Sequence, residues 1–115
     1  AFEAEYKYSE DLLHGEAVAI GISLAFELSV ELGLCPKNDS ERVLKHFKKV
    51  GLPTKLPARN HSLKYSDIIT HMRKDKKVSK DKITFVLTRG IGKSFLTQDV
   101  PTKTLEKTIK KFLNL

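Results

Sequence analysis

The sequence has a single cysteine, no long hydrophobic run and no repeated segment. Because Cys35 has no second cysteine to pair with, an internal disulfide is excluded, which is typical of proteins of the reducing cytoplasm. No stretch approaches about 18 apolar residues without a break, and no signal-peptide pattern opens the chain, so we expect no membrane span and no membrane partner. With 115 residues, 40% of them hydrophobic, the chain can form one domain with a buried core. We expect that domain to be soluble and cytoplasmic.

Negative charge is scarce relative to positive charge, and the formal net charge is +7. Lysines form three clusters: Lys45, Lys48 and Lys49; Lys74, Lys76 and Lys77; and Lys103, Lys107, Lys110 and Lys111. A nucleic-acid-binding protein would present such a surface. The lysines nevertheless fall opposite the apolar stripes of the predicted helices, and no aromatic side chains for base stacking are interleaved with them. We therefore expect solvated helix faces and no nucleic-acid partner, with a basic helical binding module as the alternative.

The most informative segment is Leu13–Gly21, with the sequence LHGEAVAIG, which opens a long and almost wholly apolar helix. We place this helix at residues 15–33, with Gly33 as its C-cap. Because the helix has little polar surface, we expect it to be buried among neighbouring elements. Gly21 lies inside the helix, where a glycine costs about 1 kcal/mol relative to alanine. This cost indicates that another backbone packs closely against Gly21.

The rest of the chain predicts further helices and one hairpin, so the fold class is mainly α: a helical bundle-like domain with one small β-hairpin. Helices are predicted from Asp39 or Ser40 to Val50, from Ser66 to Lys74, and from about Pro101 onward. Asn38, Asp39 and Ser40 offer cap oxygens for the first of these helices, and Gly51 stops it. Their inward-facing residues are Val43, Leu44, Phe47 and Val50; Ile68, Ile69 and Met72; and Leu105, Ile109 and Phe112 or Leu113. The β-branched and aromatic residues 83–87 predict a strand, which pairs with residues 94–97 after a turn containing Gly90 and Gly92.

His14 stands at the N-terminal end of the apolar helix. The helix dipole disfavours a protonated imidazole at this end, and neutral imidazole is the form that binds a metal. A lone histidine beside an apolar helix is also commonly a packed or capping residue, so the residues alone leave both interpretations open. Glu16, in the first turn, interacts favourably with the dipole and is interpreted as structural.

Several blocks of the sequence resemble the 3-dehydroquinate synthase family. Residues 14–21, HGEAVAIG, resemble a signature of that family's helical domain. The other blocks are Gly51–Thr54 (GLPT), Met72–Val78 (the family's MxxDKKV motif), Phe85–Gly92 (its FVLxRGIG hairpin) and Asp99–Pro101 (DVP). Because the blocks occur in the family's order across almost the whole chain, together they are far more specific than any one of them.

The resemblance implies that residues 1–115 are a C-terminal helical, metal- and substrate-binding domain. The implied enzyme is a lyase of the shikimate pathway, which converts a seven-carbon keto-acid sugar phosphate, 3-deoxy-arabino-heptulosonate 7-phosphate, to 3-dehydroquinate and phosphate. In the family, the histidine of the HGE motif is a zinc ligand near the substrate hydroxyls, so His14 is expected to bind metal and substrate. The first lysine of the DKK motif contacts the substrate, so Lys76 is the expected catalytic and substrate-binding lysine, and Asp75 can orient it.

The resemblance also implies that part of the family's enzyme is absent from this chain. The family holds NAD on an N-terminal domain and completes the zinc site with an upstream glutamate and a second histidine. We therefore expect NAD and zinc, or another divalent metal, to need that missing part. Residues 1–6 look like the end of a helix, and the family has a GHxxGH motif directly before them, so we expect an inactive fragment of a homodimeric enzyme. Related sugar-phosphate cyclases share the metal site, which leaves the exact substrate open.

The remaining candidates for chemistry have simpler interpretations. We interpret Cys35, which precedes a proline, as an unreactive thiol rather than a nucleophile. The other histidines, His46, His61 and His71, lack partners at metal-ligand spacing and are expected at the surface. Residues 90–92 have the glycines of a phosphate loop, but no Lys-Ser pair follows them, so a hairpin turn is expected. No Ser-His-Asp signature is present.

Overall fold

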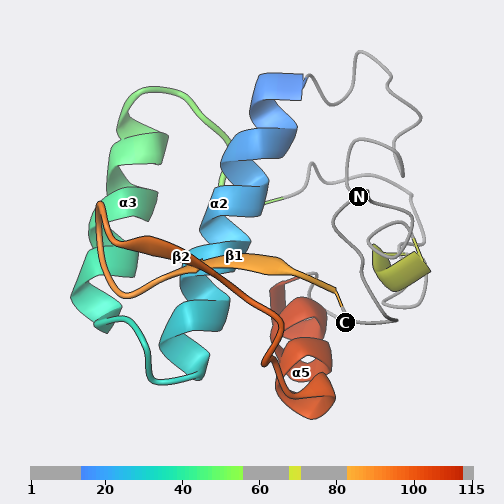
Figure 1. Cartoon of the computed structure of the whole chain (residues 1–115). Helices are drawn as coiled ribbons and strands as arrows, with labels where there is room; N and C mark the ends of the chain where they lie inside the picture. Colours follow the sequence, from blue (N-terminus) through green and yellow to red (C-terminus); the bar gives the residue numbers. More distant parts are fainter. Residues whose placement is uncertain (1–13, 56–67, 71–82, 113–115) are drawn as a thin grey trace.

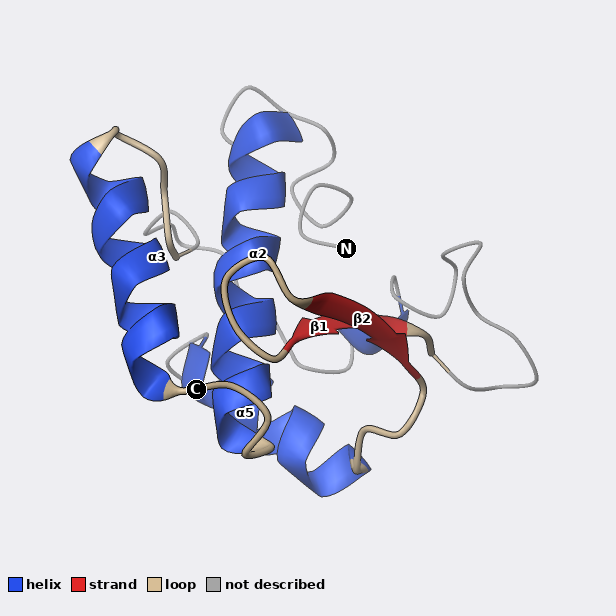
Figure 2. Ribbon diagram, turned by 60° about the vertical axis from the view of Figure 1, so that its left-hand side comes forward, coloured by secondary structure: helices blue, strands red, loops and turns tan. Residues whose placement is uncertain are grey.

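The computed structural model describes residues 14–55, 68–70 and 83–112. Within these ranges the fold is mainly α-helical with one antiparallel β-hairpin, which confirms the predicted fold class. The elements are α2 (His14–Glu31), α3 (Lys37–Lys49), β1 (Phe85–Thr88), β2 (Ser94–Thr97) and α5 (Thr102–Phe112). Helix α2 is central: α3 lies beside it, the hairpin crosses it, and α5 packs near its C-terminal end (Figures 1 and 2).

Helix α2 ends at a glycine, close to the predicted boundary. Gly33 has a left-handed φ of 74°. The Leu34 N–H donates to the Ser29 carbonyl at 2.9 Å, and the Gly33 N–H donates to the Val30 carbonyl at 3.0 Å. These two bonds form a Schellman motif, which satisfies carbonyls that the last helical turn leaves without partners. The predicted C-cap glycine is confirmed.

Helix α3 begins at Lys37, two residues before the first predicted start at Asp39. Its N-cap is Pro36, in an extended conformation, and no side chain bonds to the helix end. The expectation that Asn38, Asp39 or Ser40 would cap the helix is therefore wrong. Proline suits the position because its fixed φ leads into a helix and its missing N–H has no helical partner to lose.

The other end of α3 also closes on a glycine. Gly51 has a φ of 84°, and the Leu52 N–H donates to the Phe47 carbonyl at 2.8 Å. This end matches the prediction that Gly51 stops the helix. The predicted apolar face of α3 is only partly covered, since Phe47 is half-buried and the side chain of Val50 is 55% exposed.

The hairpin confirms the predicted pair of strands, but its first strand starts later than predicted. It begins at Phe85 rather than at residue 83, and its register runs from Phe85 opposite Thr97 to Thr88 opposite Ser94. The chain reverses through Gly90 and Gly92, and the Lys93 N–H donates to the Gly90 carbonyl at 3.0 Å. The interpretation of these glycines as a turn rather than a phosphate loop is confirmed.

A side chain of α3 holds this turn in place. The Asp39 carboxylate accepts a hydrogen bond from the Ile91 N–H, with 3.2 Å between Oδ2 and N. Oδ2 also lies 2.7 Å from the point that a Cβ on Gly90 would occupy, so position 90 needs glycine for as long as the carboxylate stays there. The predicted capping residue thus links α3 to the hairpin instead.

The core lies between α2, α5 and the inner face of β1. Its buried members are Ile20, Leu28, Ile68, Leu87, Leu105, Ile109 and Phe112. The apolar stripe predicted for α5 is therefore confirmed, and Ile68 of the third predicted helix is helical and buried. Each such side chain stabilises the fold by about 1.5–3 kcal/mol through burial. Among the described helices, none combines the length and the hydropathy needed to cross a membrane.

Candidate functional site

His14 is the first residue of α2, and its side chain is exposed. The first turn that follows contains Gly15 and Glu16, which is half-buried. The imidazole therefore stands at the accessible N-terminal end of a helix whose opposite end is anchored in the core. This placement suits a ligand that a second element must approach from outside.

The described residues supply only part of a metal site. In residues 14–55, 68–70 and 83–112, no group of three or more histidine, cysteine, aspartate or glutamate side chains is close enough to hold a metal ion. An exposed imidazole fits a zinc site as one ligand, and zinc takes about three protein ligands at a catalytic centre. A metal bound by His14 would therefore take its other ligands from outside the described residues.

Of the two predicted site residues, Lys76 lies outside the described residues, together with its neighbours Asp75 and Lys77. His61 and His71, which are predicted to be surface residues, also lie outside them. His46 is exposed on α3, which confirms its surface prediction. The structure therefore gives the position of His14 but not that of Lys76.

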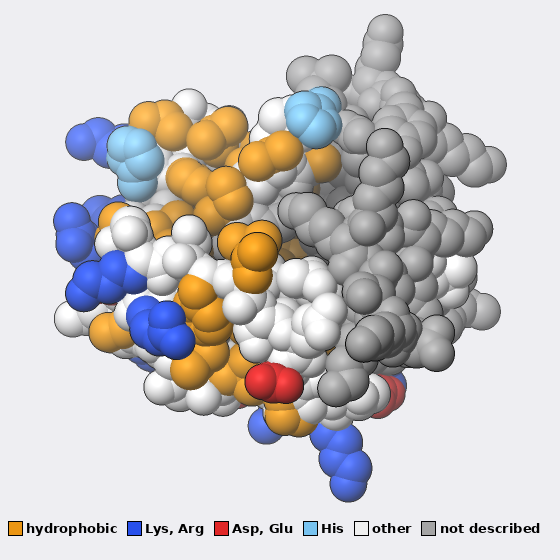
Figure 3. All heavy atoms as spheres, viewed as in Figure 1, with side chains coloured by type: hydrophobic (Ala, Val, Ile, Leu, Met, Phe, Trp, Pro, Cys, Tyr) orange, Lys and Arg blue, Asp and Glu red, His pale blue; other side chains and the backbone are white. Residues whose placement is uncertain are grey.

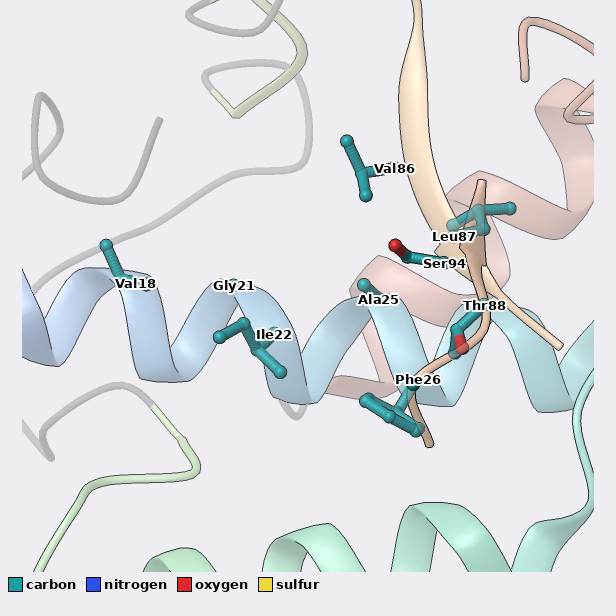
Figure 4. Close-up of a pocket in the computed structure, with 10 residues that line it drawn as sticks. Val18, Gly21, Ile22, Ala25, Phe26, Val86, Leu87, Thr88 and Ser94 are labelled. Atoms are coloured by element: carbon teal, nitrogen blue, oxygen red, sulfur yellow. The ribbon is translucent and has the colours of Figure 1, made fainter. Parts of the chain in front are cut away.

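A groove runs along α2 beside the hairpin. Its volume is about 400 Å³. Its lining residues are Val18, Gly21, Ile22, Ala25 and Phe26 of α2, and Val86, Leu87, Thr88, Gly92 and Ser94 of the hairpin (Figure 4). Figure 4 shows Val86 extending from β1 over the stretch of α2 between Gly21 and Ala25. No charged side chain belongs to this described lining, so the groove is apolar with a few hydroxyl groups at one end.

The walls of this groove are open to solvent. The exposed fraction is 46% for Val18, 38% for Ile22 and 46% for Val86. An ideal Cβ on Gly21 would have no atom within 4 Å. The expectation that α2 is buried among neighbouring elements is therefore wrong for this stretch, and no backbone among the described residues packs against Gly21.

Helical geometry places His14 on the same face of α2 as the groove. With about 100° of rotation per residue, Val18, Gly21 and Ala25 all lie within about 40° of His14 around the helix axis. From the side viewed in Figure 3, hydrophobic side chains gather over α2, α3 and the hairpin, and lysine and arginine side chains lie around their edge. The sequence contained a signal for this groove, namely a glycine in mid-helix between two β-branched residues, but not the fact that it stays open.

The hairpin is fixed to α2 by a buried serine that the sequence did not single out. The Ser29 hydroxyl donates to the Ala25 carbonyl at 2.7 Å and accepts from the Thr88 N–H at 3.1 Å. Ser29 has no exposed surface. A serine within an apolar helix is the sequence signal for such a contact, because a buried hydroxyl needs a partner.

Cys35 is buried in the loop between α2 and α3, with 7% of its surface exposed. Its thiol lies 3.4 Å from the Pro36 carbonyl oxygen. Burial, assisted by the negative charge of Asp39, raises the pKa of the thiol above its ordinary value. A raised pKa lowers the fraction of thiolate, which is the nucleophilic form. The interpretation of Cys35 as unreactive is therefore supported.

A smaller cavity of about 150 Å³ lies where α2, α3 and α5 meet. Thr108 lines it, is 2% exposed, and has no hydrogen-bond partner for Oγ1 among the described residues. Glu27 lines the same cavity, and burial raises the pKa of its carboxyl group, against the opposing charges of Lys111 and Lys55. This junction is therefore the least satisfied part of the described interior.

The lysines of α3 and α5 are exposed, as the sequence predicts. Among the described residues, two of them form ion pairs: Lys110 with Glu106 at 2.8 Å, and Lys111 with Glu31 at 3.6 Å. Both pairs are largely solvent-exposed, where such contacts contribute about 0–1 kcal/mol.

Comparison with known proteins gives these observations a context. The family model for the C-terminal part of 3-dehydroquinate synthase matches residues 1–78. A 3-dehydroquinate synthase of Ruegeria pomeroyi is 49% identical over 102 residues, which cover 88% of this chain and 28% of the relative. A 3-dehydroquinate synthase of another Ruegeria species is 44% identical over 114 residues, covering 98% of this chain and 31% of the relative. One from a Jannaschia species is 50% identical over 103 residues, covering 89% and 28%. This chain therefore spans less than a third of the length of these curated relatives.

Proposed function

The chain belongs to the 3-dehydroquinate synthase family, and we propose that it supplies the C-terminal helical part of an enzyme with that activity. The complete enzyme converts 3-deoxy-arabino-heptulosonate 7-phosphate to 3-dehydroquinate and phosphate in the cytoplasm, as a homodimer that needs NAD and zinc or another divalent metal. The isolated chain has no turnover. The observation that carries the proposal is the intact HGE segment at the exposed start of α2, within the residues that match the family.

In this proposal, His14 is one ligand of the metal and contacts the substrate beside it. A metal held with the help of His14 would supply Lewis-acid chemistry to the substrate, and NAD, when bound, would supply hydride-transfer chemistry. In this proposal, the contribution of this chain is to fix the position of the His14 imidazole. The buried side chains of α2 and the bond from Ser29 to the hairpin support that rigidity, because a helix anchored in a core positions a ligand better than a loop does.

Lys76 is the second proposed site residue. Its ammonium group is a compact positive charge suited to the phosphate or carboxylate of the substrate, and it acts as an electrostatic clamp on that anion. Its role rests on the DKK motif alone, because residues 75–77 lie outside the described ranges. No residue of this chain is assigned to NAD.

The proposal is tested by joining this chain to the part of the Ruegeria pomeroyi relative that it does not span. We expect phosphate release from the heptulosonate phosphate by the joined protein. His14→Ala is expected to lower kcat/KM at least about 100-fold and to lower the bound metal measured by elemental analysis. His46→Ala, which removes an exposed histidine from α3, is the matched control and is expected to change neither quantity.

Lys76→Met is expected to lower kcat/KM by a similar factor with the metal content unchanged, and Lys77→Met serves as its control. Full activity and full metal content in His14→Ala would contradict the proposal, and so would turnover by the 115-residue chain alone. Assays of the joined protein with other heptulose and hexose phosphates determine which sugar phosphate is the substrate.

A further inference from the structure

The cavity of about 150 Å³ between α2, α3 and α5 has no part in the proposed function. Each of the three helices contributes polar side chains to its lining: Glu27 from α2, Lys37, Ser40 and Glu41 from α3, and Thr108 from α5. Cavities that remain empty in folded proteins are apolar. The composition of this one is therefore that of a site for a polar molecule rather than that of a gap left by packing.

Thr108 supplies a buried hydroxyl group without a partner. Its side chain is 2% exposed, and Oγ1 has no hydrogen-bond partner among the described residues. Native structures contain few such groups, because each one destabilises the fold. Threonine in a helix populates two χ1 rotamers, and rotation between them exchanges the hydroxyl and methyl groups. The hydroxyl of Thr108 can therefore turn toward a molecule in the cavity that offers it a hydrogen bond.

Opposite charges face the cavity without neutralising one another. Among the described residues, neither Lys37 nor Glu41 forms an ion pair, although they lie one turn apart on α3. Both are exposed and stand at the rim, whereas Glu27 is half-buried. Burial raises the pKa of the Glu27 carboxyl group, although the charges of Lys111 and Lys55 oppose the shift. A cation placed beside the Glu27 carboxylate would stabilise its charged form.

The volume of the cavity limits its occupant. A water molecule takes about 30 Å³ in the liquid, so the cavity has room for a molecule of about five non-hydrogen atoms. A heptulose phosphate is several times larger, which separates this cavity from the site proposed at His14. A simple cation leaves Lys37 unpaired, and a simple anion leaves Glu27 unpaired. A molecule with an ammonium group at one end and a carboxylate at the other matches both charges.

We propose that this cavity binds a small zwitterion, namely an α-amino acid with a very short side chain or none. Its ammonium group pairs with Glu27 and donates a hydrogen bond to Oγ1 of Thr108, and its carboxylate pairs with Lys37. The bound molecule joins α2, α3 and α5, and it stabilises the folded chain by mass action. This binding needs neither metal nor NAD, so the inference does not rest on the proposed function.

The test is an NMR titration of the 115-residue chain with glycine, followed through the backbone amide chemical shifts. We expect saturable shifts around Thr108, Lys37 and Glu27, and none around His14. The expected dissociation constant is about 1 mM, an affinity that a molecule of this size can reach. Acetate and methylammonium, which each carry one of the two charges, are expected to bind at least about tenfold more weakly. Phenylalanine, whose ring exceeds the volume of the cavity, is expected not to bind.

Two variants remove the partners of the ammonium group. Glu27→Gln is expected to weaken glycine binding about tenfold and Thr108→Val about threefold. Unfolding cannot cause these losses, because both variants are expected to be more stable than the unaltered chain at neutral pH. Glu106→Gln and Thr104→Val change the same residue types on α5 at positions outside the lining, and they are expected to leave the dissociation constant unchanged.

A third variant separates the two ends of the ligand. Lys37→Met is expected to weaken the binding of glycine about tenfold and to leave the weaker binding of methylammonium unchanged. Lys45→Met, at an exposed position of α3 outside the lining, is its control. The titration is repeated on the joined protein described above. There, glycine at ten times its dissociation constant is expected to raise the midpoint of thermal unfolding by about 2 °C, and not to raise it in Glu27→Gln.

Three results would overturn the inference. Glycine could give no saturable shifts around the cavity. Acetate or methylammonium could bind as tightly as glycine, which would assign the cavity to a simple ion. Glu27→Gln and Thr108→Val could bind glycine as tightly as the unaltered chain. None of these results bears on His14, because the titrations contain neither metal nor sugar phosphate.

Discussion

The two faces of α2 have similar residues and opposite surroundings. Ile20, on one face, is 0% exposed and packs in the core with α5 and β1. Val18 and Ile22, on the other face, are 46% and 38% exposed. Neighbouring aliphatic residues of one helix are thus buried by this chain or left open by it. The difference shows that an apolar sequence does not by itself predict which side of a helix is buried by its own chain.

The largest effect is a difference in stability between two isoleucine-to-alanine substitutions, one on each face of α2. Ile20→Ala leaves a cavity in the core and is expected to lower the free energy of unfolding by about 2–5 kcal/mol. Ile22→Ala removes a side chain that is already 38% exposed and is expected to cost less than about 1 kcal/mol. Denaturant unfolding of both variants checks this contrast, and equal losses would contradict the assignment of a packed and an open face.

The next effect concerns the buried serines of α2. Ser29→Ala leaves the buried Thr88 N–H without its acceptor, which is expected to cost about 1–3 kcal/mol. Ser23 is also fully buried, but its hydroxyl donates only to the Ala19 carbonyl of the same helix, at 3.0 Å. Ser23→Ala is therefore the matched control and is expected to cost clearly less, because that carbonyl retains its helical N–H partner. Unfolding curves that coincide for the two variants would argue against the link between α2 and the hairpin.

A smaller effect, of opposite sign, is expected on α5. Thr108→Val replaces a buried hydroxyl that has no partner among the described residues by a methyl group of the same shape. The free energy of unfolding is expected to rise by about 1 kcal/mol. Thr104→Val, at a half-buried position of the same helix, is expected to stay within about 0.5 kcal/mol of the unaltered chain. A loss of stability in Thr108→Val would show that the hydroxyl binds an internal water in the neighbouring cavity.

The smallest effect depends on pH. Burial raises the pKa of Glu27 above its ordinary value of 4.5, although Lys111 and Lys55 oppose the shift. The fold therefore favours the protonated carboxyl group, and the stability that this group contributes is present below the ordinary value and is lost as pH rises through the raised one. Glu27→Gln is expected to be more stable than the unaltered chain at neutral pH and equally stable at a pH well below 4.5. The difference between their unfolding free energies across that range is the measurement, and a difference that grows on acidification would reverse the sign.

Much of the fold could be predicted from local signals. Gly33 and Gly51 end their helices because a left-handed residue closes each one, and such closures depend only on nearby residues. The stripe of Leu105 and Ile109 gave the buried side of α5 from its spacing alone. The start of α3 was misplaced because Asp39 had a stronger partner than the helix end, namely the Ile91 N–H of a turn 52 residues further along the chain. Partners so distant in sequence leave no local pattern.

The features of the candidate site that depend on local sequence were predictable, and those that depend on contacts between distant elements were not. His14 is found at the exposed helix start, as its position before an apolar run indicates. The link from Ser29 to Thr88 and the cavity beside Thr108 were missed, because each depends on how α2 meets another element. The expected close approach of a backbone to Gly21 is not found among the described residues, where nothing lies within 4 Å of its Cβ position.

Because the hydrogen bond between Ser29 and the hairpin fixes one end of α2, a small tilt there displaces the other end of the helix by a larger distance. Fifteen residues separate Ser29 from His14, which at 1.5 Å per residue is about 22 Å of rigid rod, so a tilt of about 3° at the anchored end swings the imidazole by about 1 Å. Metal–ligand bonds tolerate deviations of only about 0.2 Å. If His14 binds a metal as proposed, substitutions in the hairpin are therefore expected to weaken that metal's binding at the opposite end of α2.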